Sequence, residues 1–359
     1  MNVPGIEGFA VIVPAYNASG TIADCLQAIV SSEAKPSEII VYHDGLTDNV
    51  NRIALATHAR IISNPGRVVG PARGRNIGAR ESTCEILIFV DADVIVAKDA
   101  FRLLLEEIAS DRQIWAAFGS YDRAPRVNRR TALYANLRHH WVHQNGRREA
   151  VTFWAGLGAV RRDAFWAVGG FNERATAPEI EDIELGAKLK SQGGRIRLVP
   201  EAMGTHCKDW TIAQLWRTDI FQRAIPWAML LAGGACDAGH LNTAPRDRWS
   251  AVLAYFGPLM LAGCYLSAWS GVGFVVATVC YVYLNRGLFQ LLLRSGVTVL
   301  MAGSMLHWIY HLYASAAYTA VKLGLFRRPE DRLRFDAANR RPTAPLATEF
   351  VRSEKVDQE

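Results

Sequence analysis

Short apolar runs alternate with amphipathic stretches through the first 200 residues, and this alternation constrains the fold more than any other feature. The runs end at proline, glycine or aspartate, which is typical of short buried strands. Residues 151–171 are predicted to form a strand pair and a short helix. The other predicted strands are residues 9–16, 37–45, 60–63, 85–90, 114–120 and 195–202, and the predicted helices are residues 18–32, 48–59, 70–82, 98–110 and 179–194. This alternation indicates an α/β fold with a mixed, mostly parallel sheet and helices on both faces.

Polar residues follow three of the predicted strands. They are the segment from Pro14 to Asn17, the residue Asp44, and the segment from Asp91 to Asp93. In open α/β sheets, ligands bind at the carboxyl ends of the strands. We therefore expect all three to lie on one ligand-binding rim.

The run EILIFVDADVIV, residues 85–96, contains the acidic pair Asp91 and Asp93. Burying two unpaired carboxylates inside a strand would be costly, so we expect both at its exposed end. Two aspartates separated by one residue can reach one hard cation, and oxygen ligands suit Mg²⁺ or Mn²⁺. Such a cation would bridge to a diphosphate. The alternative is a solvated turn that happens to contain two aspartates.

Two further stretches carry weaker signals. Asp44 ends a strand, where it could accept a hydrogen bond from a base or a ribose. The stretch GPARGRNIGARES places Arg73, Arg75 and Asn76 at a helix start, where phosphate or sugar oxygens are favoured.

Six stretches together resemble the family-2 nucleotide-sugar glycosyltransferases, which have the Rossmann-like GT-A fold. They are collinear and cover about the first 200 residues. The stretches are VIVPAYNASGTIADCL, IIVYHDGLTD, GPARGRNIGA, ILIFVDADV, GAVRRDAFWAVGGFNE and EIEDIELGAKLKSQGGRIRLVP.

The resemblance implies a site for a nucleotide-sugar donor. The implied donor-binding residues are Pro14, Tyr16, Asn17, Asp44, Arg73, Asn76 and Asp91. The family usually has two adjacent aspartates where this chain has His43 and Asp44. This departure leaves the nucleotide open among UDP, GDP and dTDP.

The resemblance also implies a metal site and a catalytic base. Asp91 and Asp93 match the metal-binding DXD pair of the family, and Asp182 matches the general base that deprotonates the acceptor hydroxyl. Glutamates beside Asp182 would raise its pKa while the helix dipole would lower it. His206 is a candidate for a further metal ligand, and the alternative is a polar residue of the acceptor loop.

Two other histidines, His139 and His143, stand four residues apart. Such spacing can hold zinc, but no third or fourth ligand is evident, so we do not expect a zinc site.

The chain becomes mostly apolar from Ser250 to Leu323. We predict transmembrane helices at residues 249–324, because stretches such as 250–269 are long enough to cross a bilayer. Three spans would place the arginine-rich end outside, against the positive-inside tendency, so the number of spans stays open. The alternative is a buried core of a soluble domain. The remaining predicted parts are a catalytic domain at 1–210, an amphipathic interfacial linker at 211–248 and a basic, disordered cytosolic tail at 325–359.

Composition bears on location and partners. The six cysteines form no CxxC pair, which is typical of reduced thiols in a cytosolic domain, and no signal peptide is evident. The net charge of +6 gathers beside the apolar segment, which suits an anionic membrane better than nucleic acid.

These observations lead us to expect a metal-dependent, inverting glycosyltransferase in the cell membrane, with its catalytic domain in the cytoplasm. It would transfer a single sugar to a lipid or lipid-linked hydroxyl. Processive synthases carry a QxxRW motif, and the different spacing of Gln222, Arg223 and Trp227 argues against processive synthesis. The alternatives are such a synthase and a catalytically silent glycosyltransferase-like membrane scaffold.

Overall fold

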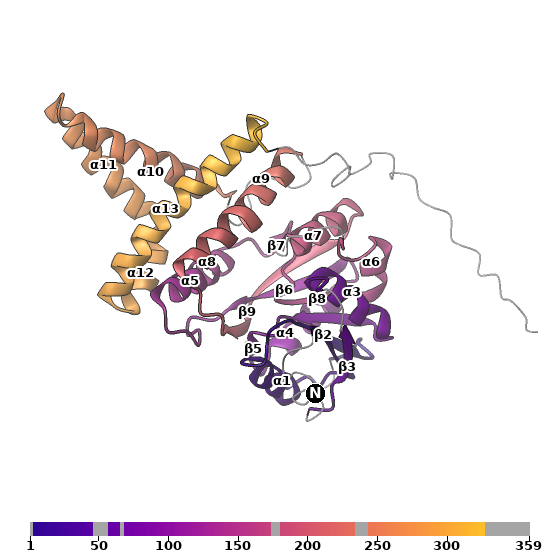
Figure 1. The fold of residues 1–359 in the computed structure, drawn as a ribbon. Coiled ribbons are helices and arrows are strands. Elements are labelled where there is room, and N and C mark those ends of the chain that lie inside the picture. The colour runs from indigo at the N-terminus through magenta and orange to yellow at the C-terminus, as the bar shows by residue number, and fades with distance from the viewer. Residues whose placement is uncertain (1–2, 46–56, 65–67, 174–179, 234–242, 327–359) are drawn as a thin grey trace, which may run out of the picture. The chain divides into compact units, whose positions relative to one another are not determined.

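The computed structural model describes residues 3–45, 57–64, 68–173, 180–233 and 243–326. Its centre is a nine-stranded sheet with the strand order β3-β2-β1-β4-β8-β6-β9-β5, and β7 pairs with β9 (Figure 1). The strands are β1 (Phe9–Ala15), β2 (Glu38–Asp44), β3 (Arg60–Asn64), β4 (Ile86–Val90), β5 (Val94–Val96), β6 (Ile114–Tyr121), β7 (Glu149–Ala150), β8 (Leu157–Arg161) and β9 (Arg195–His206).

Six strands of this sheet run in one direction, and β5, β7 and β8 run in the other. The pairs β1–β2, β2–β3, β1–β4 and β6–β9 are parallel, whereas β8 lies antiparallel between β4 and β6. Strands β5 and β7 pair antiparallel with β9. The predicted mixed, mostly parallel sheet is therefore confirmed.

Helices cover both faces of the sheet. They are α1 (Ile22–Ser31), α3 (Pro71–Glu81), α4 (Ala100–Ser110), α5 (Arg130–Gln144), α6 (Arg162–Ala167) and α7 (Glu181–Ser191). One core layer contains apolar side chains of α1 and α4, and the other contains those of α3, α6 and α7. Every residue of β4 is fully buried between these layers, which explains why its sequence is a continuous apolar run.

Helix α3 lies unusually close to the sheet because two glycines face it. A Cβ atom at Gly74 would lie 2.6 Å from the Tyr42 ring, and one at Gly78 would lie 2.5 Å from Ile12. The missing side chains let the helix backbone approach β1 and β2, and this contact positions the polar residues of α3 near the ends of these strands.

The structure differs from the expected elements at several places. Helix α5 and the short strands β5 and β7 were not predicted. Within residues 151–171 the structure has one strand, β8, followed by α6, where a strand pair was expected. Most of the helix predicted at residues 48–59 lies outside the described residues.

The C-terminal part of the described chain is helical (Figure 1). Its elements are α8 (Ile212–Arg217), the π-helix η1 (Thr218–Ala224), α9 (Ile225–Ala232), α10 (Pro245–Gly263), α11 (Ala268–Leu284), α12 (Arg286–Arg294) and α13 (Val297–Lys322). Helix α5 shares a hydrophobic core with this part, in which Tyr134, Leu137 and Trp141 pack with Leu288 and Leu306. Packing is thus continuous across residue 210, where a domain boundary was predicted.

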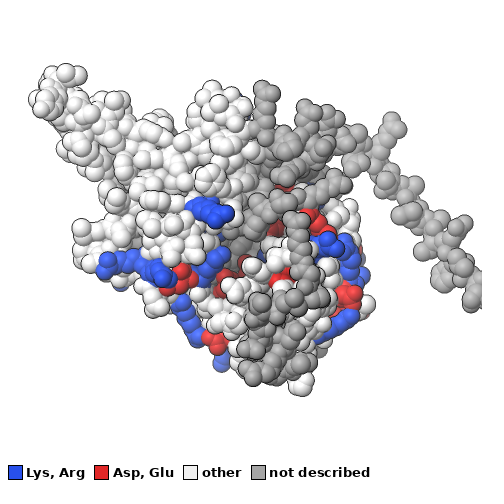
Figure 2. Space-filling view, in the orientation of Figure 1, with Lys and Arg blue, Asp and Glu red and all other residues white. Residues whose placement is uncertain are grey.

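Helices α10 and α11 form a hairpin whose residues 250–284 include no Asp, Glu, Lys, Arg or His. Figure 2 shows this projecting part without charged side chains, whereas charges gather over the sheet domain. At its tip, Tyr265, Leu266 and Trp269 are 100%, 92% and 81% exposed. Judged by length and composition, no single helix in the described ranges qualifies as a membrane span, but α11 and α12, which meet at a 73° bend, qualify as a pair.

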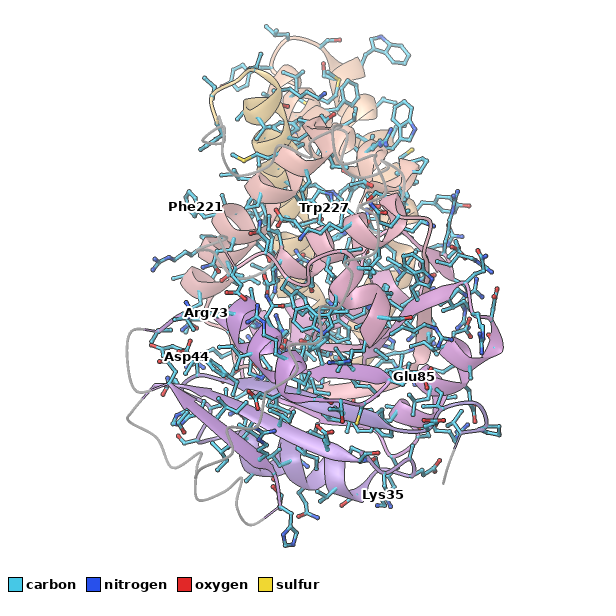
Figure 3. All side chains as sticks on the ribbon, turned by 90° about the vertical axis from the view of Figure 1, so that its right-hand side faces the viewer. Lys35, Asp44, Arg73, Glu85, Phe221 and Trp227 are labelled. Carbon is cyan, nitrogen blue, oxygen red and sulfur yellow. The ribbon has the colours of Figure 1, made fainter. Side chains whose placement is uncertain are left out.

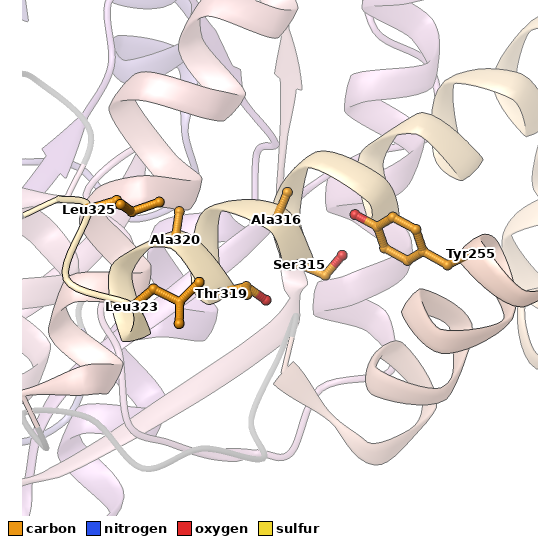
Figure 4. A pocket seen from close by; sticks show the side chains of 7 residues that line it. All are labelled: Tyr255, Ser315, Ala316, Thr319, Ala320, Leu323 and Leu325. Carbon is orange, nitrogen blue, oxygen red and sulfur yellow. The ribbon is translucent and has the colours of Figure 1, made fainter.

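A pocket of about 420 Å³ lies between α10 and α13 (Figure 4). Its lining consists of Tyr255, Ser315, Ala316, Thr319, Ala320, Leu323 and Leu325. None of these side chains is charged at neutral pH, so this pocket lacks the groups that a phosphorylated donor needs.

Candidate active site

The acidic pair Asp91 and Asp93 lies in the tight turn between β4 and β5. The Val94 N–H donates to the Asp91 carbonyl at 3.0 Å, and the Asp91 N–H donates to Gly156 at 3.2 Å. The two side chains remain 32% and 28% exposed. Both carboxylates therefore stand at the carboxyl end of a buried strand, and neither is enclosed in the core.

His206 lies beside Asp93 because β5 and β9 pair. Val94 is directly opposite His206 in the register, and the Cys207 N–H donates to the Asp93 carbonyl at 2.9 Å. The His206 Nε2 atom is 3.8 Å from the Asp93 Oδ2 atom. The ring of His206 also stacks on Tyr121, with centroids 4.3 Å apart.

The charges of these two groups follow from their surroundings. Removal from water, and then the neighbouring Asp91, raise the pKa of Asp93 to about 6. Burial, and then Lys208, lower the pKa of His206 to about 3. His206 is therefore neutral at pH 7, the state in which an imidazole nitrogen can bind a metal.

Arg75 joins the acidic pair to the acidic helix α7. Its Nη2 atom donates to Asp91 Oδ1 at 2.6 Å, and its Nη1 atom donates to Glu181 Oε1 at 2.7 Å. The arginine is only 4% exposed, and its guanidinium lies over the Phe171 ring. The hydrogen bonds of Arg75 therefore go to carboxylates of the chain itself. The prediction was that Arg75 attracts phosphate or sugar oxygens of a donor.

Asp182 stands in the first turn of α7, next to Glu181. Its Oδ2 atom accepts from the Ala155 N–H at 3.2 Å, and its Oδ1 atom accepts from the Ile183 N–H at 2.8 Å. Burial, and then Glu181, raise the pKa of Asp182 to about 7, although Arg75 and these hydrogen bonds oppose the shift. We call Asp91, Asp93 and Asp182, with Arg75 between them, the acidic site.

The structure gives Asp44 and Asn76 partners within the chain. Asp44 is buried and accepts from Asn64 at 3.0 Å and from the N–H groups of Val69 and Gly70, both at 2.9 Å. The Asn76 amide is buried, donates to the Phe171 carbonyl at 2.9 Å and accepts from the Phe171 N–H at 3.0 Å. Both side chains thus fix the backbone around α3, and their contact with a donor stays a prediction.

The other predicted donor residues are more accessible. Pro14 is half-buried, while Tyr16 and Asn17 are exposed, and Asn17 has a φ of 51° in a left-handed turn after β1. Arg73 is about half exposed, with its Nε atom 4.0 Å from Glu173. In Figure 3, Asp44 and Arg73 lie at the same edge of the sheet, below the helical segment with Phe221 and Trp227.

An aromatic cluster borders the acidic site. Tyr121 contacts His206, His139 and Trp154 with ring centroids between 4.3 and 4.8 Å apart. His139 lies 4.0 Å from His143, whose Nδ1 atom donates to the Gly119 carbonyl at 3.0 Å. Burial lowers the pKa of both histidines, that of His143 to about 4. Sequence reasoning did not assign Tyr121 and Trp154 to the site.

Two cations lie near Trp210, one from the segment after β9 and one from η1. The Lys208 Nζ atom lies 3.9 Å from the centre of the Trp210 ring, and the Arg223 guanidinium lies 5.8 Å from it. Lys208 lowers the pKa of both Asp93 and His206. Sequence reasoning missed Lys208, although it stands two residues after His206.

The acidic pair offers few protein ligands for a metal. Within the described ranges, no three Asp, Glu, His or Cys side chains are grouped so that they could hold a metal ion. The available donor set is the two partly exposed carboxylates of Asp91 and Asp93, with the neutral His206 imidazole nearby but not grouped with them as a third ligand. Such a set fits a hard divalent cation that takes its remaining ligands from phosphate oxygens or water.

Part of the chain is similar to known proteins. Residues 10–169 match the sequence profile of glycosyl transferase family 2. The poly-β-1,6-N-acetyl-D-glucosamine synthase of Staphylococcus aureus strain MSSA476 is 26% identical over 229 residues, which cover 60% of this chain and 54% of that protein. The Staphylococcus epidermidis synthase is 23% identical over 268 residues, covering 69% and 58%. The chain thus spans about half the length of the curated relatives it matches.

A solved structure shares the fold over nearly the whole chain. The mannosyltransferase PcManGT from Pyrobaculum calidifontis, solved with GDP-Man and Mn²⁺, superposes with a TM-score of 0.52 at 20% identity. The match covers 88% of this chain and 87% of that one. Residues 10–169 therefore resemble glycosyl transferase family 2, and the chain has the GT-A fold.

Proposed function

We propose that the protein transfers a sugar, with inversion, from a nucleotide-sugar donor to an acceptor hydroxyl. The observation that carries this proposal is the acidic site, in which Arg75 joins the Asp91 turn to the helix that bears Asp182. Arg75 thereby links the Asp91 turn to the first turn of α7, although Asp91 and Asp182 lie about 90 positions apart in the sequence.

Asp182 would act as the general base. An alcohol has a pKa far above neutrality, so its proton must pass to a nearby base as the oxygen attacks. A carboxylate with a pKa of about 7 accepts that proton more readily than an ordinary aspartate. The acceptor oxygen would displace the nucleoside diphosphate in one step, which inverts the anomeric carbon.

Asp91 and Asp93 would hold Mg²⁺ or Mn²⁺, with His206 as a candidate further ligand. When bound, such a cation neutralises charge on the departing diphosphate. Lys208 and Arg223, which both lie near the Trp210 ring, would add positive charge beside the diphosphate. Asp44, Arg73, Asn76 and the segment from Pro14 to Asn17 would surround the rest of the donor.

We also propose that the enzyme works at the cytoplasmic face of the cell membrane on a lipid or lipid-linked acceptor. The uncharged hairpin of α10 and α11 supports membrane attachment, because its exposed aromatic and aliphatic side chains would be unfavourable in water. The number of spans and the topology belong to this proposal.

A processive synthase is the second candidate, and the names of the staphylococcal relatives favour it. Both candidates predict Mn²⁺- or Mg²⁺-stimulated release of a nucleoside diphosphate by the detergent-solubilised protein. Transfer of one sugar gives a single short product, whereas a synthase gives a ladder. No release from any common nucleotide sugar would contradict both.

A further inference from the structure

The π-helix η1 contains a buried carboxylate, Asp219, that binds three side chains from three helices. Asp219 is 2% exposed. It accepts from Arg138 of α5 at 2.7 Å, from Arg223 of η1 at 3.0 Å and from the Tyr313 hydroxyl of α13 at 2.6 Å. A buried carboxylate is retained at such a place only when its hydrogen bonds and charge are matched.

Asp219 is ionised at neutral pH. Burial acts to raise its pKa, but Arg138 and Arg223, with the Tyr313 hydrogen bond, outweigh burial and keep the pKa below its usual value. Two arginines therefore share one permanent negative charge.

The two arginines lie in different surroundings. The side chain of Arg138 is 11% exposed, and its guanidinium lies 4.2 Å from the centre of the Tyr310 ring. The side chain of Arg223 is 44% exposed and lies toward Trp210. Lys208, which stands two residues after His206, lies 3.9 Å from the same Trp210 ring, so Arg223 and Lys208 meet at one ring beside the segment that leaves the acidic site.

The geometry of η1 explains why Arg223 takes this place. An arginine side chain has many rotamers, and a carboxylate four residues earlier on the same helix restricts them. The π-helical turn from Thr218 to Ala224 is a rare local conformation that is frequent at functional sites. Helix α13 takes part as well, since Tyr313 donates to the oxygen that also accepts from Arg138.

We propose that Asp219 is a positioning residue, which holds the Arg223 guanidinium beside the acidic site, where it binds the donor diphosphate. Because Tyr313 also binds Asp219, the position of the Arg223 guanidinium depends on α13. This inference rests on the proposed function, because it assigns Asp219 to the same donor site.

The test begins with calorimetric titration of UDP, GDP and dTDP into the wild-type protein in the presence of Mn²⁺. The sugar donors that contain the nucleotide that binds are then used as substrates. Asp219→Asn keeps the shape of the side chain and removes its charge. We expect the donor KM and the Kd of the nucleoside diphosphate to rise about tenfold, as for loss of a charged hydrogen bond. Tyr313→Phe should raise both about threefold, because it removes one of the three partners.

A double-mutant cycle separates positioning from a general effect on the fold. In an Arg223→Gln background, Asp219→Asn should not raise the donor KM further. Glu107→Gln is the matched control, because Glu107 accepts from Arg197 at 2.7 Å on the α4 side of the sheet, and it should leave KM unchanged.

An unchanged KM in Asp219→Asn, or an equal rise with and without Arg223, would overturn the inference. If Asp219→Asn does not fold, the donor KM of Tyr313→Phe provides the test. A wild-type donor KM in Tyr313→Phe would overturn the inference. A wild-type protein that releases no nucleoside diphosphate would instead contradict the proposed function.

Discussion

Arg75 and Asp91 form a charged hydrogen bond of 2.6 Å, although they come from a helix and a turn on different parts of the sheet edge. The same guanidinium binds Glu181, so one buried cation holds the Asp91 turn and the start of α7 in a fixed relation. The separation of the acidic pair from the candidate base is thus set by a side chain that need not contact the substrate.

We expect Arg75→Gln to destabilise the protein by ~3 kcal/mol, because it removes the buried guanidinium that pairs with both Glu181 and Asp91. Urea or thermal unfolding measures the loss. Arg60→Gln is the control, since Arg60 pairs with Glu81 at the surface and should change stability by less than ~1 kcal/mol. Equal losses in the two variants would contradict a structural role for Arg75.

Asp182→Asn should lower kcat by about 10³-fold while donor binding stays near the wild-type value, because only proton transfer is lost. The measurements are nucleoside diphosphate release and calorimetric binding. Asp163→Asn changes a carboxylate in the first turn of α6, outside the acidic site, and should retain activity. Normal turnover by Asp182→Asn would refute the base assignment.

The activity should rise with pH through about 7 and then level off, because Asp182 must lose its proton to act as a base. The free energy of unfolding changes with pH in the opposite direction. The folded-state pKa of Asp182 lies above the unfolded value, so its contribution to stability is present at low pH and is lost as pH rises toward 7. Measurements of the rate and of the unfolding free energy from pH 5 to 8 check the two predictions. A rate that does not change with pH would contradict a pKa of about 7 for Asp182.

His206→Ala should weaken Mn²⁺ binding about tenfold in the presence of a nucleoside diphosphate, because a neutral nitrogen near Asp93 is removed. Titration followed by the electron paramagnetic resonance signal of free Mn²⁺ measures the affinity. His58→Ala, at an exposed turn, serves as the control. An unchanged Mn²⁺ affinity would show that His206 is not a metal ligand. Its role would then be to pack against Tyr121.

Trp269→Lys should reduce flotation of the purified protein with phosphatidylglycerol-containing liposomes, because it places a charge at the apolar tip of the hairpin. Val68→Lys adds the same charge at an exposed apolar residue of the sheet domain and should float as the wild type does. Loss of flotation in both variants, or in neither, would argue against lipid contact at the tip.

The sheet could be predicted from the sequence because its central strands are buried on both faces. Such strands, as in β4, leave continuous apolar runs that end where the polar rim begins. Helix α5 escaped prediction because its buried face includes Asn136, His140 and His143, which a reading by hydrophobicity assigns to the surface. Strand β5 has three residues, too few to show a period.

The role of Arg75 could not be predicted for a related reason. Its two partners are 16 and 106 residues away in the sequence, so nothing local distinguishes it from Arg73, which is half exposed. The positions of Asp91, Asp93 and Asp182 at the ends of elements were easier to predict, because the sequence marks those boundaries, whereas their roles stay predictions.

Helix α5 has a practical consequence for the way this chain can be divided. Its His139 and His143 side chains meet Trp154 beside the acidic site, while its Tyr134 and Trp141 side chains pack with Leu288 and Leu306 from the C-terminal helices. An excised fragment ending at residue 210 would leave the latter surface open to solvent and remove the support behind the two histidines. Through α5, the sheet domain and the C-terminal helices share side-chain packing, and a cut at residue 210 would divide that packing.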